Sequence, residues 1–269
     1  MRIAKLLTAC ALVTSITLGF SYNSIADSAP LPIVANQCSS FIEPGNPGHA
    51  DLYLCRDGYI NGYDYKTKQP AWVAYKLTGK SVGVSIKRKD RFAADTAVPK
   101  QYRSELSDYR KSGYDRGHLA PYAAMDFSQE SANQSFYLSN MSPQKGGLNR
   151  QGWAQLEKYV RFWAKYKGEI FVYTGPIYKK QKIHKTIGKS KVAVPDYYFK
   201  IVYAPKQKEA IAFVMPNKKV KRKDVAKYRV SIKDIEQRTG LQFLTNLPEN
   251  ERLRLVDGVS KMWRTHYGK

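Results

Sequence analysis

Four consecutive residues, Asp115-Arg116-Gly117-His118, place a carboxylate, a permanent cation, a conformationally free residue and an imidazole in a row. We expect Gly117 to let the backbone take angles that other residues avoid, which would aim His118 differently from a side chain on a strand or helix. Taken alone, the tetrapeptide is equally compatible with a structural histidine. The segment downstream therefore decides how it is interpreted.

A polar loop over residues 138–150 leads into a helical pattern. The apolar residues Trp153, Leu156, Val160 and Trp163 recur at three- and four-residue steps, which marks one face of a helix. The spacing predicts a helix over residues 151–166, with its apolar face against a core.

Two polar residues of this region form a candidate metal site. Asn149 lies at the predicted helix start, where Asn is a favoured N-cap and the backbone N–H groups favour anions. Glu157 follows eight residues later, a little over two turns, so the two side chains are expected on roughly the same side. Amide and carboxylate oxygens suit Mg²⁺, which keeps several waters. The alternative is an N-cap Asn and a solvated Glu.

The tetrapeptide and the segments after it (140–144, 148–149, 153 and 156–157) resemble the DNA/RNA non-specific endonucleases, the ββα-metal family that includes mitochondrial endonuclease G. Residues 54–59, 72–75, 136–140 and 173–176 also resemble family segments, in the family's order. The resemblance covers about residues 52–247.

The resemblance implies a metal-dependent enzyme that hydrolyses phosphodiester bonds of DNA and RNA and leaves 5′-phosphate products. It implies His118 as the general base, which suits an imidazole with an ordinary pKa of about 6.5. It implies Asn149 as a ligand of Mg²⁺, with Mn²⁺ as the alternative metal, and Glu157 as the residue that holds metal-bound waters. Asn140 is expected to be a catalytic-site residue that orients His118 or the bound backbone.

Other polar residues are expected to support the site. The family has an Arg upstream of the tetrapeptide that stabilises the transition state, and Arg88 is the first candidate here, with Arg91 second. Their run, residues 87–92, is also compatible with a solvated basic edge. Asp115 is expected to orient its loop, Arg116 to pair with it or face the phosphate, and Gln144 to support the substrate or the structure.

The charge of the chain agrees with this interpretation. Lys and Arg number 45 against 22 Asp and Glu, a net charge of +23, which favours a polyanionic partner such as the phosphate backbone of DNA or RNA. The 20 Tyr residues would allow stacking on unpaired bases. The basic run at 218–223 is expected to be an exposed loop.

A non-catalytic nucleic-acid-binding or DNA-uptake protein would share this charge, but it would not need His118, Asn149 and Glu157 together. The sequence does not determine an oligomeric state.

Residues 1–26 resemble a signal peptide, with a short basic region, an apolar stretch and small residues before Asp27. A membrane span and lipidation at Cys10 are less favoured, because the apolar run is short. The expectation is an exported protein, periplasmic or secreted, with no membrane attachment once processed and with residues 27–269 as a single endonuclease domain. Only Cys38 and Cys55 would remain, an even pair that predicts a disulfide; two free buried thiols are the alternative.

The remaining patterns predict an α+β fold with a central, largely antiparallel sheet flanked by helices, and the resemblance adds a ββα-metal motif at the active site. Strands are predicted from β-branched and aromatic segments at 72–77, 81–86, 136–139, 170–174, 197–203 and 209–214. Further helices are predicted at 230–240, with Ser231 as a start and Gly240 as a stop, and near 253–264.

Overall fold

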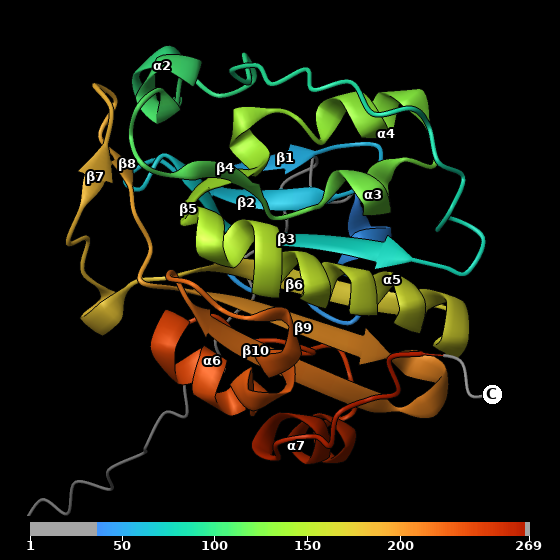
Figure 1. Cartoon of the computed structure of the whole chain (residues 1–269). Coiled ribbons are helices and arrows are strands. Elements are labelled where there is room, and N and C mark those ends of the chain that lie inside the picture. The colour runs from blue at the N-terminus through green and yellow to red at the C-terminus, as the bar shows by residue number, and fades with distance from the viewer. Residues whose placement is uncertain (1–36, 267–269) are drawn as a thin grey trace, which may run out of the picture. The chain divides into compact units, whose positions relative to one another are not determined.

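The computed structural model describes residues 37–266, so the predicted signal peptide lies outside the described residues. A seven-stranded antiparallel sheet forms the centre (Figure 1). Its strands lie in the order β1-β2-β3-β6-β9-β10-β11, and their bounds are Leu52–Cys55, Ile60–Asp64, Gln69–Leu77, Ile170–Ile177, Tyr197–Ala204, Glu209–Pro216 and Arg229–Val230. Every pairing within it is antiparallel, which confirms the predicted fold class.

Helices cover both faces of this sheet (Figure 1). Helix α5 (Ala154–Lys167) packs on one face, where Trp153, Leu156, Val160 and Trp163 are buried. Helices α6 (Ile232–Thr239) and α7 (Glu249–Asp257) pack on the other face. The sheet separates two apolar clusters because successive strand residues point to opposite faces.

Shorter elements surround the sheet. The small helices are α2 (Leu106–Tyr109), α3 (Tyr122–Met125) and α4 (Gln129–Gln134). Two hairpins stand apart from the central sheet: β4 (Asp115–His118) with β5 (Met141–Gln144), and β7 (Thr186–Ile187) with β8 (Val192–Ala193). No helix among residues 37–266 is long and apolar enough to cross a membrane.

The helix signals at α6 are confirmed. The side chain of Ser231 accepts a hydrogen bond from the backbone N–H of Asp234, 3.1 Å away, as an N-cap does. Gly240 ends the helix in the left-handed conformation at φ 75°. The predicted helix near 253–264 is wrong in its second half, since α7 ends at Asp257 and residues 258–264 are irregular. There the indole N–H of Trp163 donates to the carbonyl of Arg264 at 2.8 Å.

Two predicted strands are absent. Residues 81–86 form a turn and an irregular segment, because Ser81 and Thr78 exchange hydrogen bonds that close the chain after β3. Ser85 lies there at φ 58°, which a strand does not accommodate. Residues 136–139 contribute only an isolated bridge between Tyr137 and Ala93 before a 3₁₀ turn at Leu138–Asn140.

A disulfide joins Cys38 to Cys55, with 5.7 Å between their Cα atoms, as predicted from the even pair. Cys38 lies beside a short 3₁₀ turn, Ser39–Phe41, and Cys55 ends the edge strand β1. The bond therefore ties the N-terminal part of the described chain to the edge of the sheet.

We expect the double substitution Cys38→Ser with Cys55→Ser to lower the free energy of unfolding by about 2–4 kcal/mol, because the bond restricts the unfolded chain. Urea unfolding of the oxidised protein and of the variant measures the difference. Peptide mapping without reductant checks the bond itself, and two free thiols in the folded protein would contradict it.

Candidate active site

The tetrapeptide is strand β4, paired antiparallel with β5 so that Asp115 faces Gln144 and His118 faces Met141. The predicted role of Gly117 is therefore wrong, since its φ does not lie in the left-handed region. Gly117 is needed for space: a Cβ atom there would lie 2.3 Å from Oε1 of the buried Gln144. The hairpin and helix α5, which follows it in the chain, form the ββα motif.

Asn149 occupies a π-helical segment, Leu148–Trp153, that runs directly into α5, so it is not the predicted N-cap. Its side-chain amide donates to Oδ2 of Asp115 at 3.0 Å. Arg150 holds the same carboxylate through two hydrogen bonds of 2.9 and 2.6 Å. Partial burial alone would raise the pKa of Asp115, but the hydrogen bonds from Arg150 and Asn149 hold it below its ordinary value. The side-chain amide oxygen of Asn149 is thereby left free to bind a cation.

A basic loop braces this segment. The backbone N–H of Val220 donates to Gly147 at 3.1 Å, and that of Gly152 donates to Val220 at 3.0 Å. Only Val220 of the run 218–223 is buried, and the five cations around it are exposed, as expected for this loop. Gly152 is required for the contact, because a Cβ there would lie 2.5 Å from the Val220 side chain.

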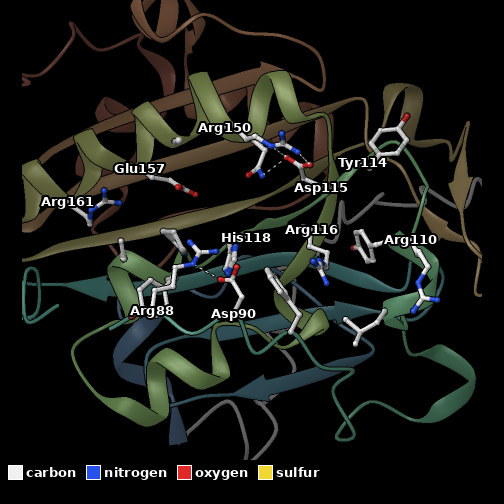
Figure 2. Close-up of a pocket in the computed structure, with 18 residues that line it drawn as sticks. Arg88, Asp90, Arg110, Tyr114, Asp115, Arg116, His118, Arg150, Glu157 and Arg161 are labelled. Atoms are coloured by element: carbon white, nitrogen blue, oxygen red, sulfur yellow. Dashed lines mark hydrogen bonds and ion pairs between the residues drawn. The ribbon is translucent and has the colours of Figure 1, made fainter. Parts of the chain in front are cut away.

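A cavity of about 850 Å³ lies between the hairpin and α5 (Figure 2). Six of the residues singled out in the sequence line it: Arg88, Asp115, Arg116, His118, Asn149 and Glu157. These residues come from a loop, a hairpin, a π-helical segment and a helix. The fold therefore gathers residues from four separate segments around one cavity, and no single sequence pattern spans those segments.

His118 lies on the cavity wall against the edges of Phe92 and Phe136. Its Nε2 is shut off from solvent and has no hydrogen-bond partner among residues 37–266, so Nδ1 is the ring nitrogen that faces the cavity. Burial, with the charges of Arg88 and Arg116, lowers the pKa of His118 to about 3. The imidazole is therefore neutral at physiological pH, which corrects the expectation of an ordinary pKa.

Glu157 projects into the cavity from the first turn of α5. Burial raises the pKa of its carboxyl to about 7, while the charges of Lys200, Arg161 and Arg88 act in the opposite direction. No cluster of three or more His, Cys, Asp or Glu side chains that could hold a metal occurs among the residues the structure describes. The other two carboxylates of the cavity, Asp90 and Asp115, are paired with Arg88 and Arg150. The oxygens left for a metal are the Asn149 amide and the Glu157 carboxylate, a set that fits a cation retaining most of its waters.

The structure distinguishes between the two candidate arginines. Arg88 lines the cavity, pairs with Asp90 at 2.6 Å and lies 5.5 Å from the ring centre of Tyr122. Arg91 is exposed and does not line the cavity. Of these two arginines, Arg88 is therefore the one placed at the cavity.

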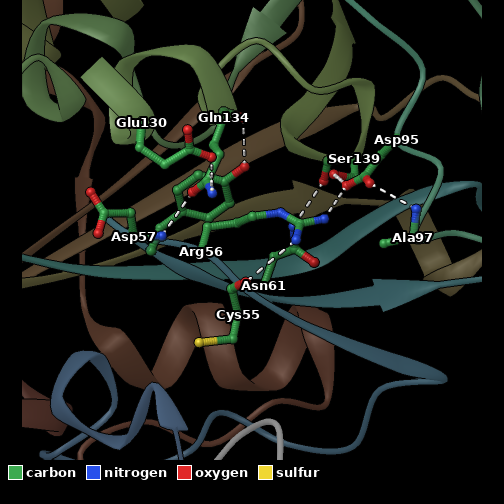
Figure 3. Close-up of polar contacts among 10 residues, drawn as sticks. Cys55, Arg56, Asp57, Asn61, Asp95, Ala97, Glu130, Gln134 and Ser139 are labelled. Atoms are coloured by element: carbon green, nitrogen blue, oxygen red, sulfur yellow. Dashed lines mark hydrogen bonds and ion pairs between the residues drawn. The ribbon is translucent and has the colours of Figure 1, made fainter. Parts of the chain in front are cut away.

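Asn140 does not line the cavity, so the role open to it is the orienting one that the resemblance implies, and that role stays a prediction. It is fully buried, and its amide bonds to the backbone of Ala120 in both directions, at 2.9 and 2.8 Å. Its neighbour Ser139 is fixed by Asp95, which also pairs with Arg56 at 2.5 Å (Figure 3). Gln144 is likewise buried, beneath Gly117, and supports the hairpin instead of touching a substrate.

The sequence analysis missed several cavity residues. Arg161 follows Glu157 by four positions on the same helix face, a spacing that could have identified it. Arg150 is adjacent to Asn149 in sequence. The others, which local spacing does not reveal, include Asp90, Tyr109, Arg110 and Tyr114.

Comparisons with known proteins agree with this geometry. The DNA/RNA non-specific endonuclease family matches residues 37–250, and the chain belongs to that family of metal-dependent nucleases. The mitochondrial Nuclease 1 of Schizosaccharomyces pombe is 35% identical over 240 residues, covering 82% of this chain and 74% of that protein. Human mitochondrial endonuclease G is 36% identical over 216 residues, covering 76% and 72%.

Nuclease C1 of Cunninghamella echinulata is 34% identical over 223 residues, covering 77% of this chain and 88% of its own. A chain in the crystal structure of the EndoG/EndoGI complex superposes with a TM-score of 0.73 and 31% identity, covering 83% of this chain and 96% of that one.

The expectation of an exported protein, periplasmic or secreted, is contradicted by these comparisons, because the fission-yeast and human relatives are mitochondrial nucleases.

We expect Gly117→Ala to destabilise the protein by about 1–3 kcal/mol, because the added methyl group would overlap the buried Gln144 amide. Gly258→Ala is the matched control, since nothing lies within 4 Å of a Cβ there. Chemical denaturation of both variants measures the cost. If the Gly117→Ala and Gly258→Ala variants have equal free energies of unfolding, the hairpin accommodates the added methyl group at Gly117 and the prediction is wrong.

The low pKa of His118 predicts a pH-dependent stability. Between pH 6.5 and about 3 the unfolded chain binds a proton at His118 that the folded protein does not, so folding weakens as the pH falls. We expect wild type to lose stability relative to His118→Gln by up to ~1.4 kcal/mol per pH unit below pH 6.5. Urea midpoints of both proteins from pH 7 to pH 4 test this. If the difference in urea midpoint between wild type and His118→Gln does not change with pH, the pKa of His118 is not lowered in the folded protein.

Proposed function

We propose that this chain is a Mg²⁺-dependent endonuclease, with Mn²⁺ as an alternative metal, that hydrolyses phosphodiester bonds of DNA and RNA without sequence preference and leaves 5′-phosphate products. The observation that carries the proposal is that His118, Asn149 and Glu157 line one cavity although they come from β4, the π-helical segment and α5. Residues 27–269 are proposed to form a single nuclease domain.

His118 is the proposed general base. Its Nδ1 faces the cavity, and the neutral imidazole can accept a proton from a water molecule as that water attacks phosphorus. The same low pKa that keeps the ring neutral makes it a weak base. The enclosed site and the fixed orientation of the ring between Phe92 and Phe136 offset part of that weakness.

Asn149 and Glu157 are the proposed metal residues, Asn149 through its carbonyl oxygen and Glu157 through water. When bound, the divalent cation neutralises charge on the phosphate and at the leaving 3′ oxygen. Asp115 contributes by accepting a hydrogen bond from the Asn149 amide N–H, which leaves the amide oxygen for the cation. Arg150 fixes Asp115 in turn.

Cations around the cavity would bind the substrate phosphates. Arg88, Arg116 and Arg161 line it. The guanidinium of Arg116 lies 4.0 Å from the ring centre of Phe92, which holds it in one orientation. The exposed lysines of the loop at 218–223 adjoin this site and would add phosphate contacts that carry no sequence information.

We expect His118→Ala to lower turnover of a defined duplex about 10²–10⁴-fold with little change in affinity, because the base supplies proton transfer and dispersed cations supply binding. Asn149→Ala and Glu157→Ala should instead raise the Mg²⁺ concentration needed for half-maximal rate. Turnover measured against Mg²⁺ for all three variants, with duplex binding in Ca²⁺ as the control, separates the roles.

Two outcomes would contradict these assignments. The general base is wrong if His118→Ala keeps more than about a tenth of wild-type turnover with normal binding. The metal dependence is wrong if wild type degrades plasmid DNA equally well with excess EDTA.

A further inference from the structure

The imidazole of His118 is enclosed by two rings that come from segments far apart in the sequence. The ring centres of Phe92 and Phe136 lie 5.7 and 5.4 Å from that of His118, and 5.0 Å from each other. Nε2 of the imidazole has no hydrogen-bond partner in the described part of the chain. The orientation of this ring therefore depends on packing, and so on the contacts that hold the two phenylalanines.

Phe92 belongs to residues 87–95, which form no regular helix or strand. Its neighbour Ala93 donates a backbone hydrogen bond to the carbonyl of Phe136 at 3.3 Å, and its carbonyl accepts one from Leu138 at 2.9 Å. These two bonds join the irregular segment directly to the segment that carries the second ring. The two walls around the imidazole therefore move together.

A buried carboxylate gathers three parts of the chain just beyond this junction (Figure 3). Asp95 is 3% exposed, and its Oδ2 accepts hydrogen bonds from the guanidinium of Arg56 at 2.5 Å and from the hydroxyl of Ser139. Its Oδ1 accepts from the backbone N–H of Ala97 at 3.0 Å. Arg56, Asp95 and Ser139 lie outside the lining of the cavity, so they can affect the reaction only through the residues that they hold.

The same carboxylate reaches the backbone after His118 by way of Ser139. The next residue, Asn140, accepts the backbone N–H of Leu119 on its carbonyl at 3.0 Å. Its side-chain amide exchanges two hydrogen bonds with the backbone of Ala120, at 2.9 and 2.8 Å. The contacts of the carboxylate thus lead both to the rings that enclose the imidazole and to the chain that follows it.

Stability alone is a weak explanation for the Arg56–Asp95 pair. Taking two charges out of water costs about as much as their attraction returns, and apolar replacements of a buried pair are often neutral or stabilising. The third partner, Ser139, belongs to a segment next to the imidazole. A positioning role explains this choice of partners, because a misplacement of about 1 Å at a reacting group can lower the rate about 10²-fold.

We propose that Asp95, held by Arg56, is a positioning residue that sets the orientation of the His118 ring for proton transfer. It fixes the end of the segment that carries Phe92 and, through Ser139, the turn that follows Phe136. The proposal rests on the proposed function, in which His118 is the general base.

The test compares Asp95→Ala, which removes all three hydrogen bonds, with Ser139→Ala, which removes one and keeps the ion pair. His118 is one of four histidines, so its ring C–H signals in the NMR spectrum are assigned by their loss in His118→Gln. Both variants should displace these signals, because their chemical shifts depend on where the imidazole lies against Phe92 and Phe136. The displacement should be larger in Asp95→Ala.

Turnover gives the second readout. On a saturating, defined duplex we expect kcat of Asp95→Ala to fall about 10–100-fold with KM close to wild type, and Ser139→Ala to lie between the two. Glu236→Ala is the matched control. Glu236 accepts from Arg252 at 2.6 Å and from the backbone N–H of Phe243 at 2.9 Å, on the other face of the sheet. This variant should lower the urea midpoint without changing kcat or the imidazole signals.

Wild-type imidazole signals in both Asp95→Ala and Ser139→Ala would overturn the positioning role, as would displaced signals with an unchanged kcat. Equal losses in Glu236→Ala would overturn it too, since the effect would then follow from stability alone. If Asp95→Ala does not fold, Ser139→Ala decides by the same two readouts. A wild-type protein that never cleaves, with the signals of the variants displaced as expected, would overturn the nuclease function and leave the control of the ring orientation in place.

Discussion

The packing of α5 on the central sheet determines where the chemistry lies. Trp153, Leu156, Val160 and Trp163 bury one stripe of this helix, and burial of such large apolar side chains contributes about 1.5–3 kcal/mol each. The stripe leaves the helix no freedom to rotate, so Glu157 and Arg161 on the adjoining stripe must face the hairpin. The hydrogen bond from Asn149 to Asp115 then joins the helical segment to β4 across the cavity. The catalytic geometry is thus a consequence of core packing together with one polar link.

The cavity combines opposite electrostatic requirements. A phosphate needs cations nearby, and Arg88, Arg116 and Arg161 provide them. Burial, together with the charges of Arg88 and Arg116, lowers the pKa of His118, and burial raises that of Glu157 to about 7. Lys200, which is fully buried under the helix 4.7 Å from the ring centre of Trp153, is the cation with the largest effect favouring the Glu157 carboxylate. A bound cation beside Glu157 would act in the same direction, so metal binding and ionisation of this carboxyl support each other.

Much of the fold could be predicted where the sequence pattern is long. The α5 stripe, the Ser231 and Gly240 signals and the strands β6, β9 and β10 each extend over a window in which periodicity or capping is visible. Strands β4 and β5 could not be recognised, because each has only four residues, without a clear strand pattern, and the two become strands only by pairing with each other. The inward direction of the Asn140 and Gln144 side chains could not be recognised either. Gln144 is turned inward by its place in β5 and packs beneath Gly117, whereas Asn140 precedes β5 in a 3₁₀ turn and bonds to the backbone of Ala120. Cavity residues such as Arg110 and Tyr109 depend on tertiary contacts that no local spacing encodes.

The π-helical segment determines how closely Asn149 and Glu157 line up along the helix, which their spacing in the sequence predicts only roughly. Eight residues of a regular α-helix make about 2.2 turns, which would set Asn149 and Glu157 apart by a fraction of a turn around the axis. The i→i+5 hydrogen bonds of a π-helix spread each turn over more residues, so each residue advances by a smaller angle. Because Leu148–Trp153 is π-helical, the rotation between the two residues is closer to two complete turns. Their side chains then lie nearer to one line along the helix, above the same part of the cavity. The loop at Val220 braces this segment through Gly147 and Gly152, and it therefore helps to hold an otherwise unfavourable helical form that aligns the two proposed metal residues.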